Sequence, residues 1–226
     1  DYPVSEEYGY LNGTLEKEEY REGIFVGYRY FDSFDKKVLF PFGFGLSYTS
    51  FEIKCCGMNM EEGKLRAEVQ VTNTGKKYVG KEVVQIYVTL PQTGLEKEYK
   101  RLAGFAKTRL LKPEETQTLI VEISQKQLAS FCEETHTWII EKGSYGILIG
   151  NSSDKLEQEA VLVISDTSVL EHTDAICPLQ EELRQIHMTE ELREKLVQQE
   201  KELKTAQVPQ YCFKPVMLPE KSENDG

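Results

Sequence analysis

Carboxylates are the most abundant side chains in this chain that could carry chemistry. The 226 residues include 38 Asp and Glu. Two carboxylates about 5 to 5.5 Å apart, one of them protonated near neutral pH, could serve as nucleophile and general acid on a glycosidic bond. Most of these acidic residues, however, lie in charge-rich turns and helix-like stretches, where a solvated surface position is the ordinary case. The sequence therefore singles out no carboxylate pair as catalytic.

Nucleophiles and metal ligands are sparse and badly spaced. Cys55 and Cys56 are neighbours that would point to opposite faces of a strand, so we expect reduced, space-filling thiols and no disulfide framework. The chain has no GxSxG elbow, no complete phosphate loop and none of the CxxC spacings of zinc sites. We predict no catalytic residue, no cofactor and no metal site. The other cysteines and the histidines are Cys132, Cys177, Cys212, His136, His172 and His187.

Composition excludes several classes of partner. The formal net charge is −11 and the sequence pI is about 5.0. Nucleic acids and anionic membranes select Lys and Arg clusters, and the sequence shows no basic patch, so we expect neither as a partner. No apolar run approaches the roughly 18–20 residues of a membrane span, and the start does not resemble a signal peptide. We expect a soluble, cytoplasmic protein that, beginning at Asp1, is processed or cut from a longer product.

Aromatic residues crowd the segment 22–49. Alternate residues from Ile24 to Phe31 would fall on the two faces of an extended strand, and both faces would be aromatic. Pro41, Gly43 and Gly45 predict a turn over 41–45. This is more aromatic surface than one face of a small sandwich can cover. We therefore predict an interdomain contact at Tyr28, Tyr30, Phe31, Phe40, Phe42 and Phe44.

Short alternating runs follow, bounded by turn residues, as is typical of an antiparallel, immunoglobulin-like β-sandwich. In 64–73, Leu65, Ala67, Val69 and Val71 would point inward. We place one helical turn at 125–131. The predicted strands are 51–56, 64–73, 80–90, 101–111, 116–123, 137–141, 144–150 and 159–165. The residues expected to be buried between the two sheets are Val69, Val84, Ile86, Val121 and Ile147.

More than one role is considered for each of two aromatic residues in the predicted sandwich. A buried Tyr145 would need a partner for its hydroxyl, and a corner hydrogen bond to nearby backbone is the structural interpretation. Trp138, the only tryptophan, is interpreted as core or interface and not as a sugar platform.

The last sixty residues change texture again. Leu179, Leu183 and Ile186 predict one short helix. A second is predicted over 189–207, capped by Thr189 and carrying a leucine stripe at Leu192, Leu196 and Leu203. From Pro209 onward we expect a weakly ordered tail.

Several ordered strings resemble glycoside hydrolase family 3 enzymes of the β-glucosidase type. EGIFVGYRYFD (22–32) and PFGFGLSYT (41–49) are similar to the segment that leads from that family's α/β-sandwich domain into its fibronectin type III-like domain. EVVQIYV (82–88), KRLAGFAK (100–107), LKPEE (111–115) and GSYGILIG (143–150) are similar to strands and turns of the latter domain. The family commonly has Gly-Glu where this chain has Glu114-Glu115, so that turn departs from the pattern.

The resemblance implies a mainly β chain in three parts. These are a strap over 1–46, a fibronectin type III-like sandwich over 47–166, and a helical extension with a tail over 167–226. The helical part has two alternative explanations. It could be the connector expected in family members with inverted domain order, or it could be a lineage-specific extension. In the family, the nucleophilic Asp belongs to a barrel domain and the acid/base Glu to the α/β domain or an upstream loop. Neither motif is present in this chain.

We therefore expect a non-catalytic accessory domain of a β-glucosidase, with the catalytic domains of the parent enzyme as partners. In the isolated chain, self-association or loose packing would cover the aromatic surface. An independent carbohydrate-binding or adhesion module is the alternative, and it predicts several exposed aromatics on one face. A complete enzyme of unrelated type is disfavoured, because no nucleophile and base are placed together.

Overall fold

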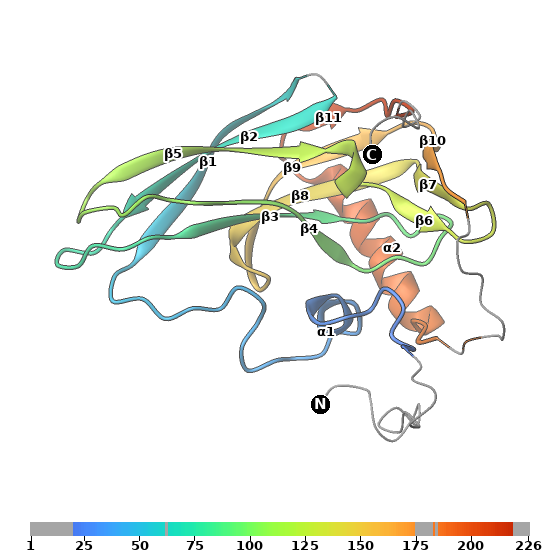
Figure 1. The fold of residues 1–226 in the computed structure, drawn as a ribbon, viewed down its shortest axis with the longest axis horizontal. Coiled ribbons are helices and arrows are strands. Elements are labelled where there is room, and N and C mark those ends of the chain that lie inside the picture. Colours follow the sequence, from blue (N-terminus) through green and yellow to red (C-terminus); the bar gives the residue numbers. More distant parts are fainter. Residues whose placement is uncertain (1–19, 62, 175–182, 184, 219–226) are drawn as a thin grey trace.

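The computed structural model describes residues 20–61, 63–174, 183 and 185–218. Its body is a sandwich of two sheets, with strand orders β1-β2-β5 and β11-β9-β8-β3-β4 (Figure 1). A small third sheet, β10-β7-β6, extends one end. The strands are β1 Phe51–Glu61, β2 Lys64–Asn73, β3 Val83–Thr89, β4 Lys100–Lys107, β5 Thr116–Ser124, β6 Ser130–Cys132, β7 Thr137–Ile140, β8 Gly143–Ser152, β9 Lys155–Ile164, β10 Ser168–His172 and β11 Gln210–Cys212.

Alternation along each strand builds the core between the sheets. In β2, Leu65, Ala67, Val69 and Val71 are buried, as predicted, while the residues between them point outward. β3, which lies between β8 and β4 in its sheet, is buried from Val84 to Thr89, including the polar Gln85 and Thr89. The predicted core residues are confirmed: all are at most 3% exposed, namely Val69, Val84, Ile86, Val121 and Ile147.

The predicted strands of the sandwich are observed, with shifted ends. The first runs on to Glu61, past a register shift between Cys55 and Gly57. The predicted helical turn at 125–131 is a short 3-10 helix, Gln125–Gln127, followed by β6. Tyr145 is 1% exposed and its hydroxyl donates to the Glu141 carbonyl at 2.8 Å, which confirms the corner hydrogen bond.

The extended strand predicted over 24–31 is wrong. Residues Tyr28–Ser33 form a short helix, α1, after Gly27, whose φ is +60°. The amides of Tyr30 and Phe31 both donate to the Gly27 carbonyl, at 3.1 and 3.3 Å. Burial of Tyr30 and Ser33, three residues apart, follows a helical period. Tertiary packing has therefore overridden the strand preference of the aromatic residues.

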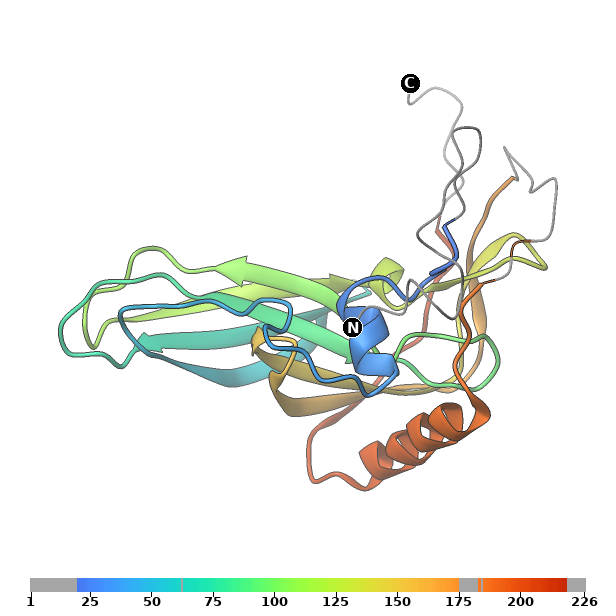
Figure 2. The same ribbon diagram turned by 90° about the horizontal axis from the view of Figure 1, so that it is seen from below.

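The C-terminal predictions were partly correct. Helix α2, Glu190–Thr205, begins where expected, and the Thr189 hydroxyl accepts from the Leu192 amide at 3.4 Å. Its Leu196 is buried, and α2 lies outside the sandwich against β8 (Figure 2). The weakly ordered tail is wrong for 209–218, because β11 pairs in parallel with β9 and Phe213 is buried in the core. A three-residue strand has no sequence signal of its own.

Some predictions fall on residues outside those that the structure describes. These are the strap residues before 20, Cys177, Leu179 and the chain beyond 218. Leu183 and Ile186 are described and lie in no helix, although Ile186 is buried. The described Cys55, Cys56, Cys132 and Cys212 are free thiols, as predicted. No helix in the described ranges is long and apolar enough to cross a bilayer.

Candidate interdomain surface

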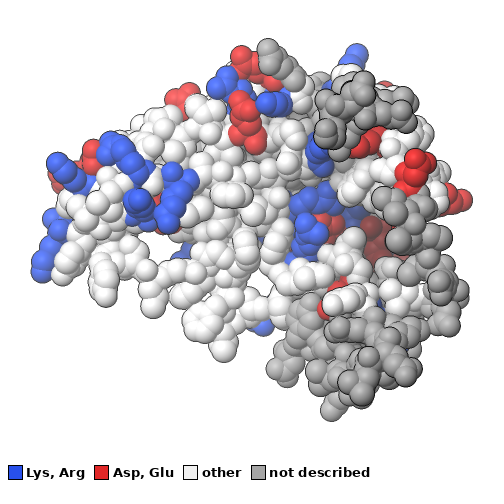
Figure 3. Space-filling view, in the orientation of Figure 1, with Lys and Arg blue, Asp and Glu red and all other residues white. Residues whose placement is uncertain are grey.

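An exposed apolar strip runs along the segment between α1 and β1. Its six members are between 44% and 93% exposed, and we call them the aromatic strip: Leu39, Phe40, Phe42, Phe44, Leu46 and Tyr48. Phe40 and Phe44 pack on each other, with ring centroids 5.0 Å apart. Figure 3 shows few charged groups along the lower edge of the molecule, where this segment runs in Figure 1. Contiguous exposed apolar surface of this kind marks interaction sites.

The strip is held on the sandwich at Phe42. The Phe42 ring lies 5.2 Å from that of Tyr28, which in turn meets the buried Tyr87 ring edge-on at 5.7 Å. The Ser153 amide donates to the Phe42 carbonyl at 2.8 Å. Gly43 follows with φ +86°, and a Cβ there would overlap the side chain of Gln85. The predicted turn over 41–45 is confirmed, since the Phe44 amide donates to the Pro41 carbonyl at 2.9 Å.

The six residues predicted for an interdomain contact therefore divide into two groups. Phe40, Phe42 and Phe44 are exposed. Tyr28 and Phe31 are half-buried, and Tyr30 is buried in a second hydrophobic cluster that also contains α2 residues. The Tyr28 hydroxyl accepts from the Leu102 amide at 2.9 Å, which ties α1 to β4. Through its ring contacts with Phe42 and Tyr87, Tyr28 supports the strip on the side that faces the sandwich.

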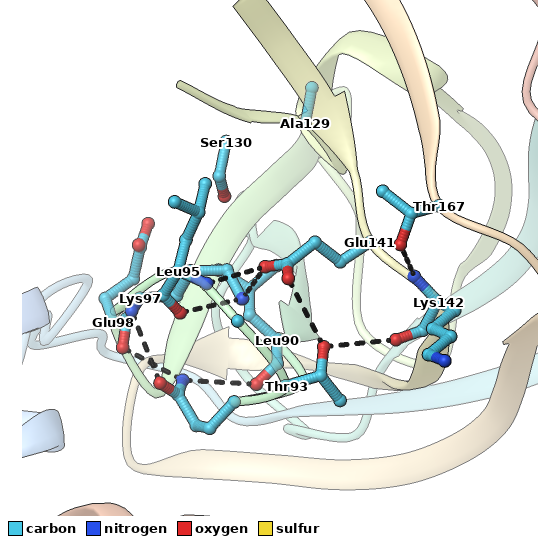
Figure 4. Close-up of polar contacts among 12 residues, drawn as sticks. Leu90, Thr93, Leu95, Lys97, Glu98, Ala129, Ser130, Glu141, Lys142 and Thr167 are labelled. Atoms are coloured by element: carbon cyan, nitrogen blue, oxygen red, sulfur yellow. Dashed lines mark hydrogen bonds and ion pairs between the residues drawn. The ribbon is translucent and has the colours of Figure 1, made fainter. Parts of the chain in front are cut away.

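Residues 91–99 form a loop of buried charge, whose polar contacts are drawn in Figure 4. The loop contacts α1 through Glu98 and Tyr99. Lys97 is 2% exposed, and its ammonium contacts the Glu141 carboxylate and donates to the Leu95 carbonyl. Glu141 also accepts from the Leu95 amide at 3.2 Å. Burial lowers the pKa of Lys97, and the Glu141 carboxylate opposes that shift. A buried charge must be paired in this way, because an unpaired one costs several kcal/mol.

The next residue, Glu98, is 1% exposed and is the centre of a second buried pair. Arg101 donates to both Glu98 carboxylate oxygens, at 2.7 and 3.2 Å, which is the strong bidentate geometry. Arg29 of α1 approaches the same carboxylate at 3.6 Å. Arg101 also donates to the Ala129 carbonyl and to Ser130. The pair joins α1, the loop and the strand β6.

The same loop also holds the strap and the helical extension in place. The Tyr99 amide donates to the Ser33 hydroxyl at 2.9 Å, and directly after the loop Lys100, the first residue of β4, pairs with Asp32 at 3.1 Å. Glu96 accepts from the Met188 amide at 2.6 Å, just before α2. The loop is therefore the junction at which the N-terminal segment, the sandwich and the C-terminal helix meet.

The buried carboxylates are placed for structure and not for acid–base catalysis. Glu141 is paired with the buried Lys97, and Glu98 with the partly buried Arg101. A glycosidase needs one carboxyl that stays protonated near neutral pH beside one that is ionised. The described residues also contain no group of three or more His, Cys, Asp or Glu that could hold a metal ion.

Trp138 is not in the core. It is 39% exposed and lies against Phe131, which is 37% exposed, with ring centroids 5.4 Å apart. The two residues are direct partners in the β6–β7 pairing.

Sequence reasoning missed the junction loop and a basic region. Charged residues in loops are usually solvated and exposed, so nothing in the sequence distinguished Lys97 or Glu98 from ordinary surface residues. The Gly75–Lys81 string does carry the GxxxxGK spacing, but Glu82 stands where a phosphate loop has Ser or Thr, and a strand follows instead of a helix. The statement that the chain has no basic patch is wrong, because folding brings lysines of two loops together at one end (Figure 3).

Comparison with known proteins shows which domains the sandwich is similar to. Residues 82–153 match the model of the fibronectin type III-like domain. A β-glucosidase of Ruminococcus albus is 38% identical over 180 residues, covering 76% of this chain and 19% of that protein. A β-glucosidase of Paenibacillus barengoltzii has a similar structure, with TM-score 0.69 and 38% identity over 72% of this chain and 19% of that one.

A GH3 β-glucosidase of Bifidobacterium adolescentis has TM-score 0.54 at 33% identity, covering 70% of this chain and 22% of that protein. These relatives are long β-glucosidases, and the chain spans about a fifth of their length.

Proposed function

We propose that this chain, which carries the fibronectin type III-like region of glycoside hydrolase family 3 β-glucosidases, supports the catalytic domains of a longer enzyme of that kind. The observation that carries the proposal is the aromatic strip, which is anchored to the sandwich and left uncovered. A catalytic domain seated on the strip would remove these side chains from water, at roughly 25 cal/mol per Å² of apolar surface buried.

We assign a structural role because specific contacts hold the strip on the sandwich, and because the buried Glu98 and Glu141 carboxylates are paired with cations. The strip follows α1, and α1 is fixed by Glu98 and Tyr99 of the junction loop and by Lys100 at the start of β4. Buried ion pairs hold their partners in one geometry, since breaking one leaves an uncompensated charge. The loop therefore transmits the position of the sandwich to the strip, and so to whatever domain covers the strip.

Hydrolysis of terminal β-glucosyl groups would then belong to the longer enzyme. We expect the purified chain to release no aryl alcohol from aryl β-glucosides. A matched preparation of Glu98→Gln and Glu141→Gln variants serves as control for contaminating activity. Turnover that survives repurification and disappears in one of these variants, or in any single Asp or Glu variant of the chain, would contradict a structural role.

A second candidate function rests on Trp138 and Phe131. Their exposed, touching rings are the kind of surface that an independent carbohydrate-binding module would present. Calorimetric titration of the chain with cello-oligosaccharides decides between the two. Binding that is lost in Trp138→Ala but retained in Phe40→Ser would favour the sugar-binding module, whereas an absence of heat supports the structural role.

A further inference from the structure

A basic region forms at the end of the sandwich next to the aromatic strip. Two loops build it, residues 74–82 between β2 and β3 and residues 107–115 at the end of β4 and before β5. Gly80 and Leu111 join the loops through a pair of backbone hydrogen bonds of 3.0 and 2.8 Å. We call the exposed cationic residues of these loops the basic tip: Lys76, Lys77, Lys81, Lys107, Arg109 and Lys112.

The tip keeps a positive charge that its own carboxylates do not cancel. Its two loops hold six Lys and Arg residues against three Glu, in a chain whose net charge is −11. The Glu115 carboxylate forms an ion pair with Arg109 at 2.8 Å, and the Glu82 carboxylate accepts hydrogen bonds from the Val83 amide and from the Asn151 side chain. None of the five lysines forms an ion pair with a described residue. Figure 3 shows the cluster at the left end of the molecule.

The tip is continuous with the aromatic strip. Tyr48, the last residue of the strip, lies 5.9 Å from the ring of Tyr78 in the first tip loop. The Lys77 ammonium lies 5.0 Å from the centre of the Tyr78 ring. The Ser50 and Thr74 hydroxyls are hydrogen-bonded at 2.9 Å, which keeps the strip's end beside the loop. One surface therefore has an apolar centre and a cationic border.

The charge on this border restricts what can cover it. A second copy that met the strip through a two-fold axis would contribute the same patch, and an axis running along the strip would place one basic tip opposite the other. Like charges placed opposite each other in an interface cost several kcal/mol. A partner domain with acidic groups facing the tip would instead gain from the contact and would be steered to it.

We propose that the domain covering the aromatic strip in the longer enzyme carries an acidic rim that pairs with the basic tip. The inference rests on the proposed function, because that function supplies the partner. The strip contributes apolar burial, and the tip fixes the orientation of the partner by charge complementarity.

The test uses the longer protein that contains residues 1–226, in parallel with the isolated chain. The tip variant is Lys76→Glu with Lys77→Glu, and its control is Lys201→Glu with Lys214→Glu, two exposed lysines outside the tip that change the net charge equally. We expect the tip variant to lower the melting temperature of the longer protein by at least about 3 °C. The control variant, and the tip variant of the isolated chain, should melt within about 1 °C of their parents.

Salt provides an independent readout. Raising NaCl from about 50 to about 500 mM shortens the Debye length from roughly 14 to roughly 4 Å and should lower the melting temperature of the wild-type longer protein, but not that of the tip variant. Equal melting of the tip and control variants, or equal salt responses, would overturn the acidic rim. The Phe40→Ser, Phe44→Ser variant tests the strip itself. If this variant leaves the melting temperature of the longer protein unchanged, the proposed function fails. If the strip variant lowers the melting temperature and the tip variant does not, the proposed function stands and only the acidic rim is excluded.

Discussion

Ile86 and Ile120 carry the same side chain in opposite environments and so form a matched pair. Ile86 on β3 is fully buried, whereas Ile120 on β5 is 49% exposed. Ile86→Ala should lower the free energy of unfolding by about 2–5 kcal/mol, through lost transfer energy and the cavity left behind. Ile120→Ala should change it by less than about 0.5 kcal/mol. Urea unfolding measures both, and equal effects would mean that the core is misplaced.

Tyr145 links one residue to the stability of the whole sandwich at high pH. Burial raises the pKa of its phenol, and the Glu141 carboxylate adds to that shift. Above pH 10, the unfolded chain loses this proton while the native state keeps it. The native state then binds more protons, so stability falls as the pH rises, by about 1.4 kcal/mol per pH unit for each such group. Burial also raises the pKa of Tyr87, which acts in the same direction.

Tyr145→Phe should therefore cost less stability above pH 10 than near pH 8. Near pH 8 it should cost about 1–3 kcal/mol, because the buried Glu141 carbonyl loses its donor. Above pH 10, the gap to the wild type should narrow, since the variant has no phenol to hold protonated. Urea unfolding at both pH values gives the result, with Tyr48→Phe as an exposed control. A gap that stays constant would refute the assigned role of the phenol.

Single residues were predicted from the sequence where burial alone decides their role. The inward residues of β2 and the Tyr145 corner follow from alternation and from the need of a buried hydroxyl for a partner. Lys97 and Glu141 were not predicted, because 44 residues separate them and each looks like an ordinary surface charge. Only the fold shows that they meet.

At the scale of elements, local pattern was sufficient for the strands of the sandwich and failed outside it. β2 and β5 have the period of two that a half-buried strand requires. The aromatic residues around α1 have strand propensity, and the helix depends on Gly27 and on contacts with β4 and α2. β11 is set by a parallel pairing to β9, about fifty residues earlier in the chain.

The described residues before Ser33 contribute to a second hydrophobic cluster that is separate from the sandwich core. Phe25 and Tyr30 pack there with Ile186, Met188 and Leu196. Removing residues 1–32 should leave the sandwich folded, because the members of its core lie beyond the cut. It should also expose the cluster side of α2, and short helices without tertiary cover are marginal.

Hydrogen exchange followed amide by amide tests this division. After the truncation, amides of α2 should exchange faster, by tenfold or more if about 1.4 kcal/mol of local stability is lost. Amides of β2 and β3 should keep their protection. Phe25→Ala in the intact chain should reproduce the effect on α2 in weaker form. General loss of protection over 50–165 would show instead that the segment is part of the sandwich core.

At the scale of the whole molecule, charge and apolar surface are distributed unevenly. The net charge of −11 led to the prediction that an anionic partner is disfavoured. The basic tip is the local exception, and it arises because loops that are 30 residues apart are neighbours in space. Composition reports a sum over the chain, whereas an interface depends on where the charges lie.

The uneven distribution predicts how the isolated chain should associate. Two copies that bury their aromatic strips would gain apolar burial, opposed by repulsion between the tips and between two chains of net charge −11. Salt screens that repulsion and leaves the apolar term, so dimerisation should strengthen as NaCl rises from about 50 to about 500 mM. Sedimentation velocity measures the constant at each salt concentration. The Phe40→Ser, Phe44→Ser variant should remain monomeric throughout, because it removes the exposed ring pair. Ile120→Ser, which removes an exposed apolar side chain from β5 in the other sheet, should behave as the wild type. Association that weakens with salt would mean that charge, and not the strip, holds the copies together.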